Sequence, residues 1–209
     1  WDMEQANTYL GELINCLHLA EKHKAGFFVC LSSTEVYPPQ NPEALPLAGC
    51  KVSDVLQPES VKGLLCMQGE NLAREFCRIR KLELSIVRYA DLGGYGLAAQ
   101  KNDVISSIAH QLNLLPEVTV NTRQTYHLLS LGDAVDALVR VLNSGRPGIY
   151  NVSSQRTTPA IELCATIKAI LGSSTVLVRE SGSPSNYAAD STAIKRELEW
   201  VELRPFEEQ

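Results

Sequence analysis

The stretch Phe27-Phe28-Val29-Cys30-Leu31-Ser32-Ser33 decides the fold of this 209-residue chain. It opens with five apolar residues, a pattern that is typical of a parallel strand buried on both faces of a sheet. Polar residues follow at once, and a second apolar run over residues 82–89 is also followed by polar and glycine residues. Two such strands predict an α/β protein with a parallel sheet, in which ligands bind beyond the carboxyl ends of the strands.

Helical segments alternate with these strands. Apolar residues recur at three- and four-residue intervals over about 8–24 and 59–81, which predicts two amphipathic helices. The order helix, strand, helix, strand predicts right-handed crossovers between parallel strands. The rest of the chain predicts helices near 104–112, from 131 onward, at 160–171 and at 190–199, the last capped by Asp190, and strands near 118–120, 149–152 and 175–179.

Composition excludes several classes of protein. The net charge is −5, from 19 basic and 24 acidic residues, and no basic stripe indicates nucleic acid. No apolar run reaches the roughly 20 residues that cross a bilayer, and residues 1–5 do not resemble a signal peptide. The six cysteines form no Cys-x-x-Cys pair, and the four histidines show no metal-ligand spacing. We therefore expect a cytoplasmic protein with reduced thiols and with no metal, nucleic-acid or membrane partner.

Five segments of the chain, taken in order, resemble one family of enzymes. Residues 28–37 are similar to its strand that ends in Ser-Ser-x-x-Val-Tyr-Gly, and residues 82–89 to its next strand. Residues 124–135, 149–154 and 190–200 are similar to three later motifs, the last of which is Asp-x-x-Lys-Ala-x-x-x-Leu-Gly-Trp. Together they resemble the NAD-dependent epimerase/dehydratase family of extended short-chain dehydrogenases.

The resemblance implies a partial Rossmann-like parallel sheet with flanking helices, plus a small α/β substrate-binding region. It places residues 1–97 in the C-terminal part of a dinucleotide-binding domain. Residues 98–209 would form a mixed α/β substrate-binding region, with one strand near 149–152 returning to the main sheet. The implied cofactor is NAD or NADP, and the implied ligand is a small molecule similar to a nucleotide sugar.

The catalytic pair of this family is missing from the chain. In the family, a Tyr phenolate removes the proton of a sugar hydroxyl, and a Lys four residues later on the same helix face lowers the Tyr pKa from about 10. Aligning Gln68-Gly69-Glu70 with the family's helical Gly-Glu places Lys62 at the Tyr position and Cys66 at the Lys position. No Tyr-x-x-x-Lys occurs elsewhere in the sequence. We expect loss of hydride-transfer chemistry rather than a new mechanism with Lys62 as a base or Cys66 as a nucleophile.

Further site residues follow from the same resemblance. Ser33 matches a hydroxyl that binds the substrate oxygen, although a strand-end hydroxyl bonded to the backbone is an equal alternative. Thr34 and Glu35 stand where dehydratases of the family carry an acidic pair. Only Glu35 is acidic, and its ordinary role would be that of a solvated loop carboxylate. The candidate cofactor contacts are Ser32, Tyr89 and Ala90.

Three residues are candidates for binding substrate. Asp91 stands at an Asn position that holds sugar or phosphate, where a carboxylate would repel a diphosphate. Tyr126 stands at the position of a phosphate-binding Arg, and the nearby Arg123 could substitute for it. These changes also favour a protein with impaired catalysis.

The cofactor turn of the family, Gly-x-x-Gly-x-x-Gly, has no counterpart in the chain, and Gly93-Gly94-Tyr95-Gly96 follows the wrong strand to replace it. Without the preceding strands, residues 27–31 would form an exposed apolar sheet edge. A missing N-terminal segment, an edge-pairing homo-oligomer or a rearranged sheet would each explain this, and we expect one of the first two. Two hypotheses remain: an impaired epimerase/dehydratase-like protein that does not bind the cofactor alone, or a non-catalytic binding or partner subunit, a pseudoenzyme.

Overall fold

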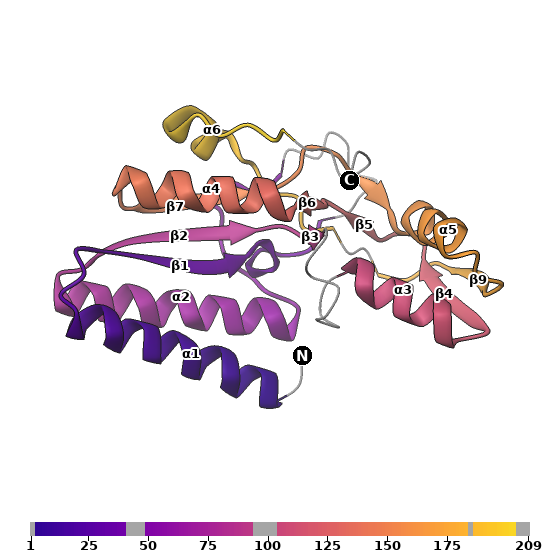
Figure 1. The fold of residues 1–209 in the computed structure, drawn as a ribbon, viewed down its shortest axis with the longest axis horizontal. Helices are drawn as coiled ribbons and strands as arrows, with labels where there is room; N and C mark the ends of the chain where they lie inside the picture. Colours follow the sequence, from indigo (N-terminus) through magenta and orange to yellow (C-terminus); the bar gives the residue numbers. More distant parts are fainter. Residues whose placement is uncertain (1–2, 41–48, 94–103, 184–185, 204–209) are drawn as a thin grey trace.

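The main sheet of the computed structural model is parallel and has three strands in the order β1-β2-β7. The structure describes residues 3–40, 49–93, 104–183 and 186–203. Two layers of helices enclose the sheet, with α1 and α2 on one face and α4 and α6 on the other (Figure 1). The bounds of these elements are Phe27–Ser33 for β1, Glu83–Tyr89 for β2, Gly148–Val152 for β7, Met3–Lys22 for α1, Val61–Arg80 for α2, Leu131–Ser144 for α4 and Thr192–Leu198 for α6.

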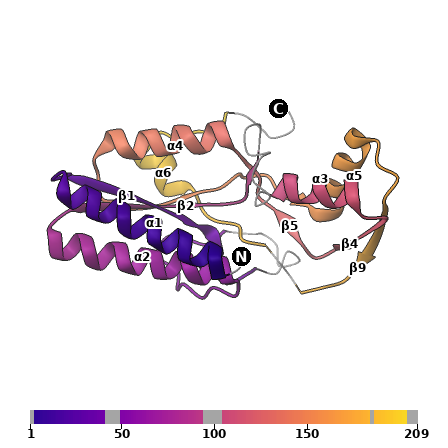
Figure 2. The same cartoon turned by 60° about the horizontal axis from the view of Figure 1, so that its bottom comes forward.

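A second group of elements lies at the end of the molecule toward which β1 and β2 point (Figures 1 and 2). In it, two helices pack on a parallel pair of strands and enclose a separate apolar core. Short strand pairs connect this group to the main sheet, and one 3-10 turn follows β1 and packs on α2. The bounds are Val104–Leu114 for α3, Ala160–Leu171 for α5, Glu117–Asn121 for β4, Val176–Glu180 for β9, Leu92–Gly93 for β3, Leu129–Ser130 for β6, Thr125–Tyr126 for β5, Thr158–Pro159 for β8 and Thr34–Val36 for the turn η1.

The predicted α/β class with a parallel sheet is confirmed. β7 pairs in parallel with β2, with Ile86 opposite Ile149, so this strand belongs to the main sheet. The domain boundary expected near residue 97 lies outside the described residues and stays a prediction. Among the helices that the structure describes, none is both long enough and apolar enough to cross a membrane.

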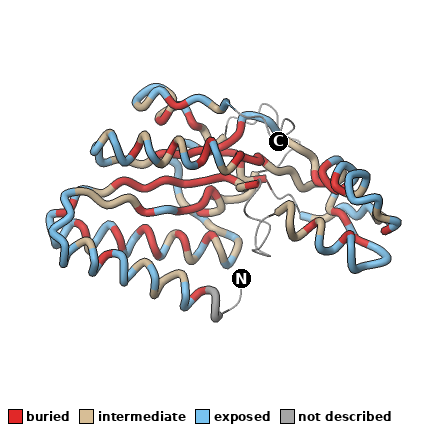
Figure 3. The backbone as a smooth tube through the Cα atoms, in the orientation of Figure 1, coloured by how far each residue is buried: buried red, intermediate tan, exposed pale blue. Residues whose placement is uncertain are grey.

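The burial of β1 on both faces, predicted from its apolar run, is wrong, whereas the exposed sheet edge expected for residues 27–31 is observed among the described strands. Leu31 is 48% exposed, and Phe27, Phe28 and Val29 are only partly buried. The reason is that β1 pairs with β2 alone among the described strands and forms an edge of the sheet. In the central strand β2, the last five residues are all buried (Figure 3).

N-terminal capping groups define where α2 and α6 begin. α2 begins after Ser60, whose Oγ accepts the N–H of Gly63 at 2.9 Å, so the helix starts two residues later than predicted. At α6 the predicted cap is wrong by one residue, because Ser191 is the N-cap. Asp190 still accepts the N–H of Thr192 at 2.8 Å, and this bond satisfies one of the free amides of the helix start.

A buried ion pair joins α2 to the sheet below the strand ends. The Glu70 carboxylate is fully buried and accepts two hydrogen bonds from Arg88, at 2.8 and 2.7 Å. Ser32 donates to the same carboxylate at 2.7 Å, and Arg88 also donates to the Tyr37 hydroxyl at 2.6 Å. Burial raises the pKa of Glu70, but the hydrogen bonds and charge of Arg88, aided by Ser32 and Arg74, outweigh it and hold this pKa below its ordinary value. Arg88 therefore has a structural role at the end of β2.

Neutralising Glu70 would leave the Arg88 guanidinium buried without its counter-ion. We expect Glu70→Gln to lower the free energy of unfolding by about 3–5 kcal/mol, measured by urea denaturation. The control is Glu75→Gln, which removes an exposed ion pair with Arg78 on the same helix. It should leave the urea midpoint nearly unchanged, because exposed pairs contribute little. Similar small effects of both substitutions would contradict the central role of the buried pair.

Candidate functional site

Glu35, Lys62 and Asp91 come together beyond the carboxyl ends of β1 and β2. The sheet register pairs Ser33 with Tyr89, so Glu35 and Asp91 each follow a strand end by two residues on neighbouring strands. Lys62 lies in the first turn of α2, and its Nζ is 2.6 Å from Glu35 Oε1. Its charge also acts on Asp91. We call these three residues the strand-end cluster.

A close backbone approach places Lys62 beside Glu35. At Gly63, a Cβ atom would overlap the carbonyl oxygen of Glu35, so only glycine allows α2 to start so near this loop. Ser60, the N-cap of α2, donates from Oγ to Glu35 Oε2 at 2.6 Å. The predicted role of Glu35 as a solvated loop carboxylate is wrong, since its side chain is only 17% exposed and binds two partners.

Lys62 is held as an ammonium group by its neighbours. Burial lowers its pKa, but the charge and hydrogen bond of Glu35, with the charge of Asp91, outweigh burial, and the net pKa lies above its ordinary value. The Lys62 amine is therefore protonated at neutral pH and has no lone pair to accept a substrate proton.

Cys66 lies one helical turn after Lys62 and points into an apolar cluster. Its neighbours there include Val36, Tyr37 and Cys50. Burial raises the pKa of the Cys66 thiol, and the opposing charge of Lys62 does not reverse this. Tyr9 shares a hydrogen bond with the thiol. Cys66 is therefore a packed thiol, in an environment that does not favour the reactive thiolate.

The segment after β5 forms another side of the strand-end cluster. Leu129 donates its N–H to the Asp91 carbonyl oxygen at 2.8 Å, and the backbone N–H of His127 donates to the Asp91 carboxylate. Burial and the charge of Glu35 raise the pKa of Asp91 more than Lys62 and His127 lower it. Asp91 is thus a half-buried carboxyl group with incomplete compensation of its charge.

Two of the three predicted substrate contacts come together. Tyr126 is half-buried and lies within electrostatic range of Asp91, which together with burial raises the Tyr126 pKa. Arg123 lies in the turn between β4 and β5, where its backbone N–H donates to Asn121 Oδ1 at 3.0 Å. Burial, together with the charges of Glu35 and Asp91, also raises the pKa of Tyr187.

Sequence reasoning missed several residues around the cluster. Ser60 could have been found, because a serine immediately before the first apolar residue of a helical pattern, here Val61, is a capping signal. No local signal of this kind marks Asn186 or Tyr187, because their place near the site depends on the tertiary fold. Asn186 Oδ1, for example, lies 2.9 Å from Nε2 of His127, a residue 59 positions earlier in the sequence.

The predicted cofactor contacts have their polar groups engaged inside the protein. Ser32 donates to Glu70 at 2.7 Å, the Tyr89 hydroxyl donates to the Ala134 carbonyl at 2.8 Å, and the Ala90 N–H donates to the Val152 carbonyl at 3.0 Å. These three donor groups are therefore not available to a dinucleotide in this structure.

The two predicted hydroxyl positions at the end of β1 also face the protein. Ser33 Oγ accepts the backbone N–H of Glu35 at 3.2 Å, which corresponds to the alternative of a hydroxyl bonded to the backbone. Thr34 is buried in η1. Of the three residues predicted around the missing Tyr, only Glu35 contributes a side chain to the strand-end cluster.

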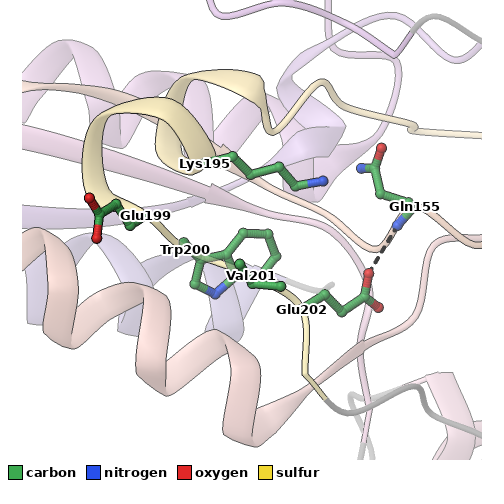
Figure 4. Close-up of a pocket in the computed structure, with 6 residues that line it drawn as sticks. All are labelled: Gln155, Lys195, Glu199, Trp200, Val201 and Glu202. Atoms are coloured by element: carbon green, nitrogen blue, oxygen red, sulfur yellow. Dashed lines mark hydrogen bonds between the residues drawn. The ribbon is translucent and has the colours of Figure 1, made fainter.

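A surface pocket lies apart from these residues, beside α6. Gln155, Lys195 and Trp200 line it, and Gln155 donates its backbone N–H to Glu202 at 3.2 Å (Figure 4). No residue of the strand-end cluster lines this pocket. It is therefore separate from the site that the sequence predicts.

Sequence comparison decides the family. The profile of the NAD dependent epimerase/dehydratase family matches residues 5–153, more than half of the chain. The chain belongs to this family. The predicted resemblance is confirmed, although no curated protein sequence matches the chain significantly.

Solved structures of similar fold support the same assignment. The dTDP-glucose 4,6-dehydratase DesIV of Streptomyces venezuelae, with NAD and TYD bound, superposes with a TM-score of 0.81 over 97% of this chain and 63% of its own, at 21% identity. The UDP-glucose 4-epimerase of Thermotoga maritima, with UDP-glucose, gives a TM-score of 0.79 over 97% of this chain and 67% of its own, at 20% identity. At such identities the likeness shows the fold, and the predicted partial Rossmann-like sheet is confirmed. The chain spans 63% of the length of the dehydratase.

Glycine at position 63 should be required for the geometry of the site. We expect Gly63→Ala to lower the thermal midpoint, because its Cβ would push α2 away from Glu35. The control is Gly11→Ala in α1, where no atom lies within 4 Å of the new Cβ. Helix propensity alone should make that control more stable by about 1 kcal/mol. Circular dichroism melting of both variants provides the measurement, and a stabilised Gly63→Ala would contradict the close approach.

The packed state of Cys66 can be tested by alkylation. We expect iodoacetamide at neutral pH to label Cys16, which is exposed, while Cys66 stays unlabelled because its thiol is buried and its pKa is raised. Peptide mass spectrometry after a short reaction gives the modified fraction at each position, and urea-unfolded protein gives full labelling as the reference. Labelling of native Cys66 as fast as Cys16 would revive the nucleophile hypothesis.

Proposed function

We propose that this chain is an epimerase/dehydratase-like protein that binds a nucleotide-sugar-like ligand and has lost the acid/base step of hydride transfer. The observation that carries the proposal is the 2.6 Å ion pair between Lys62 Nζ and Glu35 Oε1, at the position where the family places its catalytic Tyr. A protonated amine held by a carboxylate cannot take a proton from a sugar hydroxyl. Cys66, in the place of the Lys, has a buried thiol and carries no positive charge that could lower the pKa of a neighbouring phenol.

The ligand would bind beyond the ends of β1 and β2, where open α/β sheets hold their ligands. Asp91, Arg123 and Tyr126 are the proposed substrate contacts, and residues 98–209 the proposed substrate-binding region. The similar solved proteins were crystallised with NAD, TYD or UDP-glucose, which supports a sugar-nucleotide class of ligand. NAD or NADP is the cofactor of the family and would accept the hydride. The proposed cofactor contacts in this chain are Ser32, Tyr89 and Ala90. None of them is assigned a role in proton transfer.

A second candidate function is that of a non-catalytic partner subunit. It is supported by the edge of β1, where no second strand pairs among the described residues and the Leu31 side chain is exposed, so that another chain could pair there. An edge-pairing homo-oligomer belongs to this candidate. We also propose a cytoplasmic location, because all six cysteines are free thiols and such thiols persist in a reducing compartment.

The loss of hydride transfer is tested by incubating the protein with NAD or NADP and UDP-glucose or dTDP-glucose. We expect no reduced cofactor by absorbance and no 4-epimer or 4-keto product by chromatography. A functional UDP-glucose 4-epimerase and a dTDP-glucose dehydratase assayed in parallel establish the detection limit. Melting curves with millimolar NAD report cofactor binding separately, since a ligand that binds the native state raises stability by RT ln(1 + [L]/Kd).

Turnover by the wild-type chain would overturn the proposal if Lys62→Met abolished it. Such a result would show that Lys62 takes part in proton transfer despite its ion pair. Turnover that Lys62→Met leaves unchanged would indicate a contaminating enzyme. The expected result is no turnover, together with a higher melting temperature in the presence of the nucleotide sugar.

A further inference from the structure

Basic side chains gather at the end of the main sheet that is opposite the strand-end cluster. The connections from α1 into β1, from α2 into β2 and from α4 into β7 all lie at this end (Figure 1). They comprise residues 21–26, 80–83 and 144–147. Their Lys and Arg side chains outnumber their carboxylates by five to two: Lys22, Lys24, Arg80, Lys81 and Arg146 against Glu21 and Glu83. We call this surface the basic end, and it contrasts with the net charge of −5 of the whole chain.

Tertiary contacts bring these connections together, although they are far apart in sequence. Arg80 Nε lies 2.8 Å from Glu21 Oε1, so the last turns of α1 and α2 are in contact. The N–H of Glu83 donates to the Gly26 carbonyl at 3.3 Å, which joins the turns before β1 and β2. Since β7 pairs in parallel with β2, the turn that carries Arg146 lies beside them. The basic end is therefore one surface, although no basic stripe in the sequence indicates it.

Most of these cations are not neutralised within the protein. Four of them are exposed and form no ion pair in the described parts of the chain: Lys22, Lys24, Lys81 and Arg146. Two apolar side chains in the last turns of α1 and α2 are also exposed, Leu19 at 53% and Ile79 at 56%. The basic end thus offers a partner both unpaired positive charge and apolar contact area.

Backbone geometry at two of these lysines gives independent support. Lys24 and Lys81 have φ angles of 53° and 55°, in the left-handed region that favours glycine. At the ends of α4 and α5 the same conformation is taken by Gly145 and Gly172. The helix dipole does not require the two lysines, because the last turns of α1 and α2 already hold basic side chains. Strained lysines at both turns therefore indicate a role other than stability.

We propose that the basic end binds an acidic segment of a partner protein that also carries apolar side chains. Its carboxylates would pair with Lys22, Lys24 and Lys81, and its apolar side chains would cover Leu19 and Ile79. A short segment is favoured over a membrane or a nucleic acid, because an extended anionic surface would also approach the rest of the chain, whose net charge is negative. The proposal is independent of the proposed function, since no residue of the strand-end cluster takes part.

The test uses a short fluorescein-labelled peptide that is rich in glutamate and contains interspersed leucines. Fluorescence anisotropy with the complete chain should show binding at low salt, and raising the salt from about 0.05 to 0.5 M should weaken it about tenfold. Serine in place of each leucine should weaken binding about fivefold, because the contact with the exposed apolar side chains is lost. A peptide with lysine in place of each glutamate should not bind.

The double variant Lys24→Gly/Lys81→Gly separates a binding role from a structural one. Glycine relieves the left-handed strain, so the variant should melt at a higher temperature while it binds the acidic peptide about fivefold more weakly. The control Lys51→Gln/Lys168→Gln removes the same charge away from the basic end and should bind the peptide like the wild type.

Several outcomes would overturn the proposal. They are no binding of the acidic peptide at low salt, equal binding of the acidic and basic peptides, and unchanged binding by the glycine variant. A lower melting temperature of that variant would assign the two lysines to stability instead. Preferential binding of phosphatidylserine vesicles or of duplex DNA, measured in the same buffer, would also exclude an acidic protein segment as the partner.

Discussion

The buried ion pair of Glu70 and Arg88 is the constraint on which the rest of the structure depends. It joins α2 to the central strand β2, and the Ser32 hydroxyl adds the edge strand β1 to the same carboxylate. Arg88 reaches further through the Tyr37 hydroxyl, which donates to Asn151 of β7 at 2.9 Å. One carboxylate thereby fixes α2 against all three strands of the main sheet. Such a pair is costly to desolvate and is tolerated because its bonding groups are satisfied.

Fixing α2 at Glu70 also fixes its first turn, two turns earlier. Gly63 allows that turn to touch the backbone of Glu35, and Lys62 then has the Glu35 carboxylate as its partner. The pair is partly shielded from water, with side chains 35% and 17% exposed, so its attraction is stronger than that of a surface pair. The position that the family resemblance assigns to the catalytic Tyr thus carries an amine paired with a carboxylate, which is the basis of the proposed loss of proton transfer.

The sequence allowed the elements to be predicted where the signal is local. α5 begins and ends at the predicted residues, because its apolar spacing indicates a helix and the following Gly172 indicates where that helix ends. The edge position of β1 was expected from the family resemblance and not from its own apolar run, which looks the same whether one or two strands pair with it. The Lys62–Glu35 pair joins residues 27 positions apart, and Asn186 lies 59 residues from His127. Contacts of that kind depend on the tertiary fold, and no local sequence motif indicates them.

Family membership and activity depend on different residues of this chain. In two of the matching segments, Trp200 is fully buried and donates to the Asp133 carbonyl at 3.1 Å, and the Asp133 carboxylate accepts from Ser130 at 2.9 Å. Arg88 in a third segment holds Glu70. These residues pack and bond the scaffold, so a sequence match that rests on them predicts the fold. The proposed loss of proton transfer depends instead on positions 62 and 66, where the sequence departs from the family's Tyr-x-x-x-Lys pattern and the structure has an amine bound to a carboxylate and a packed thiol.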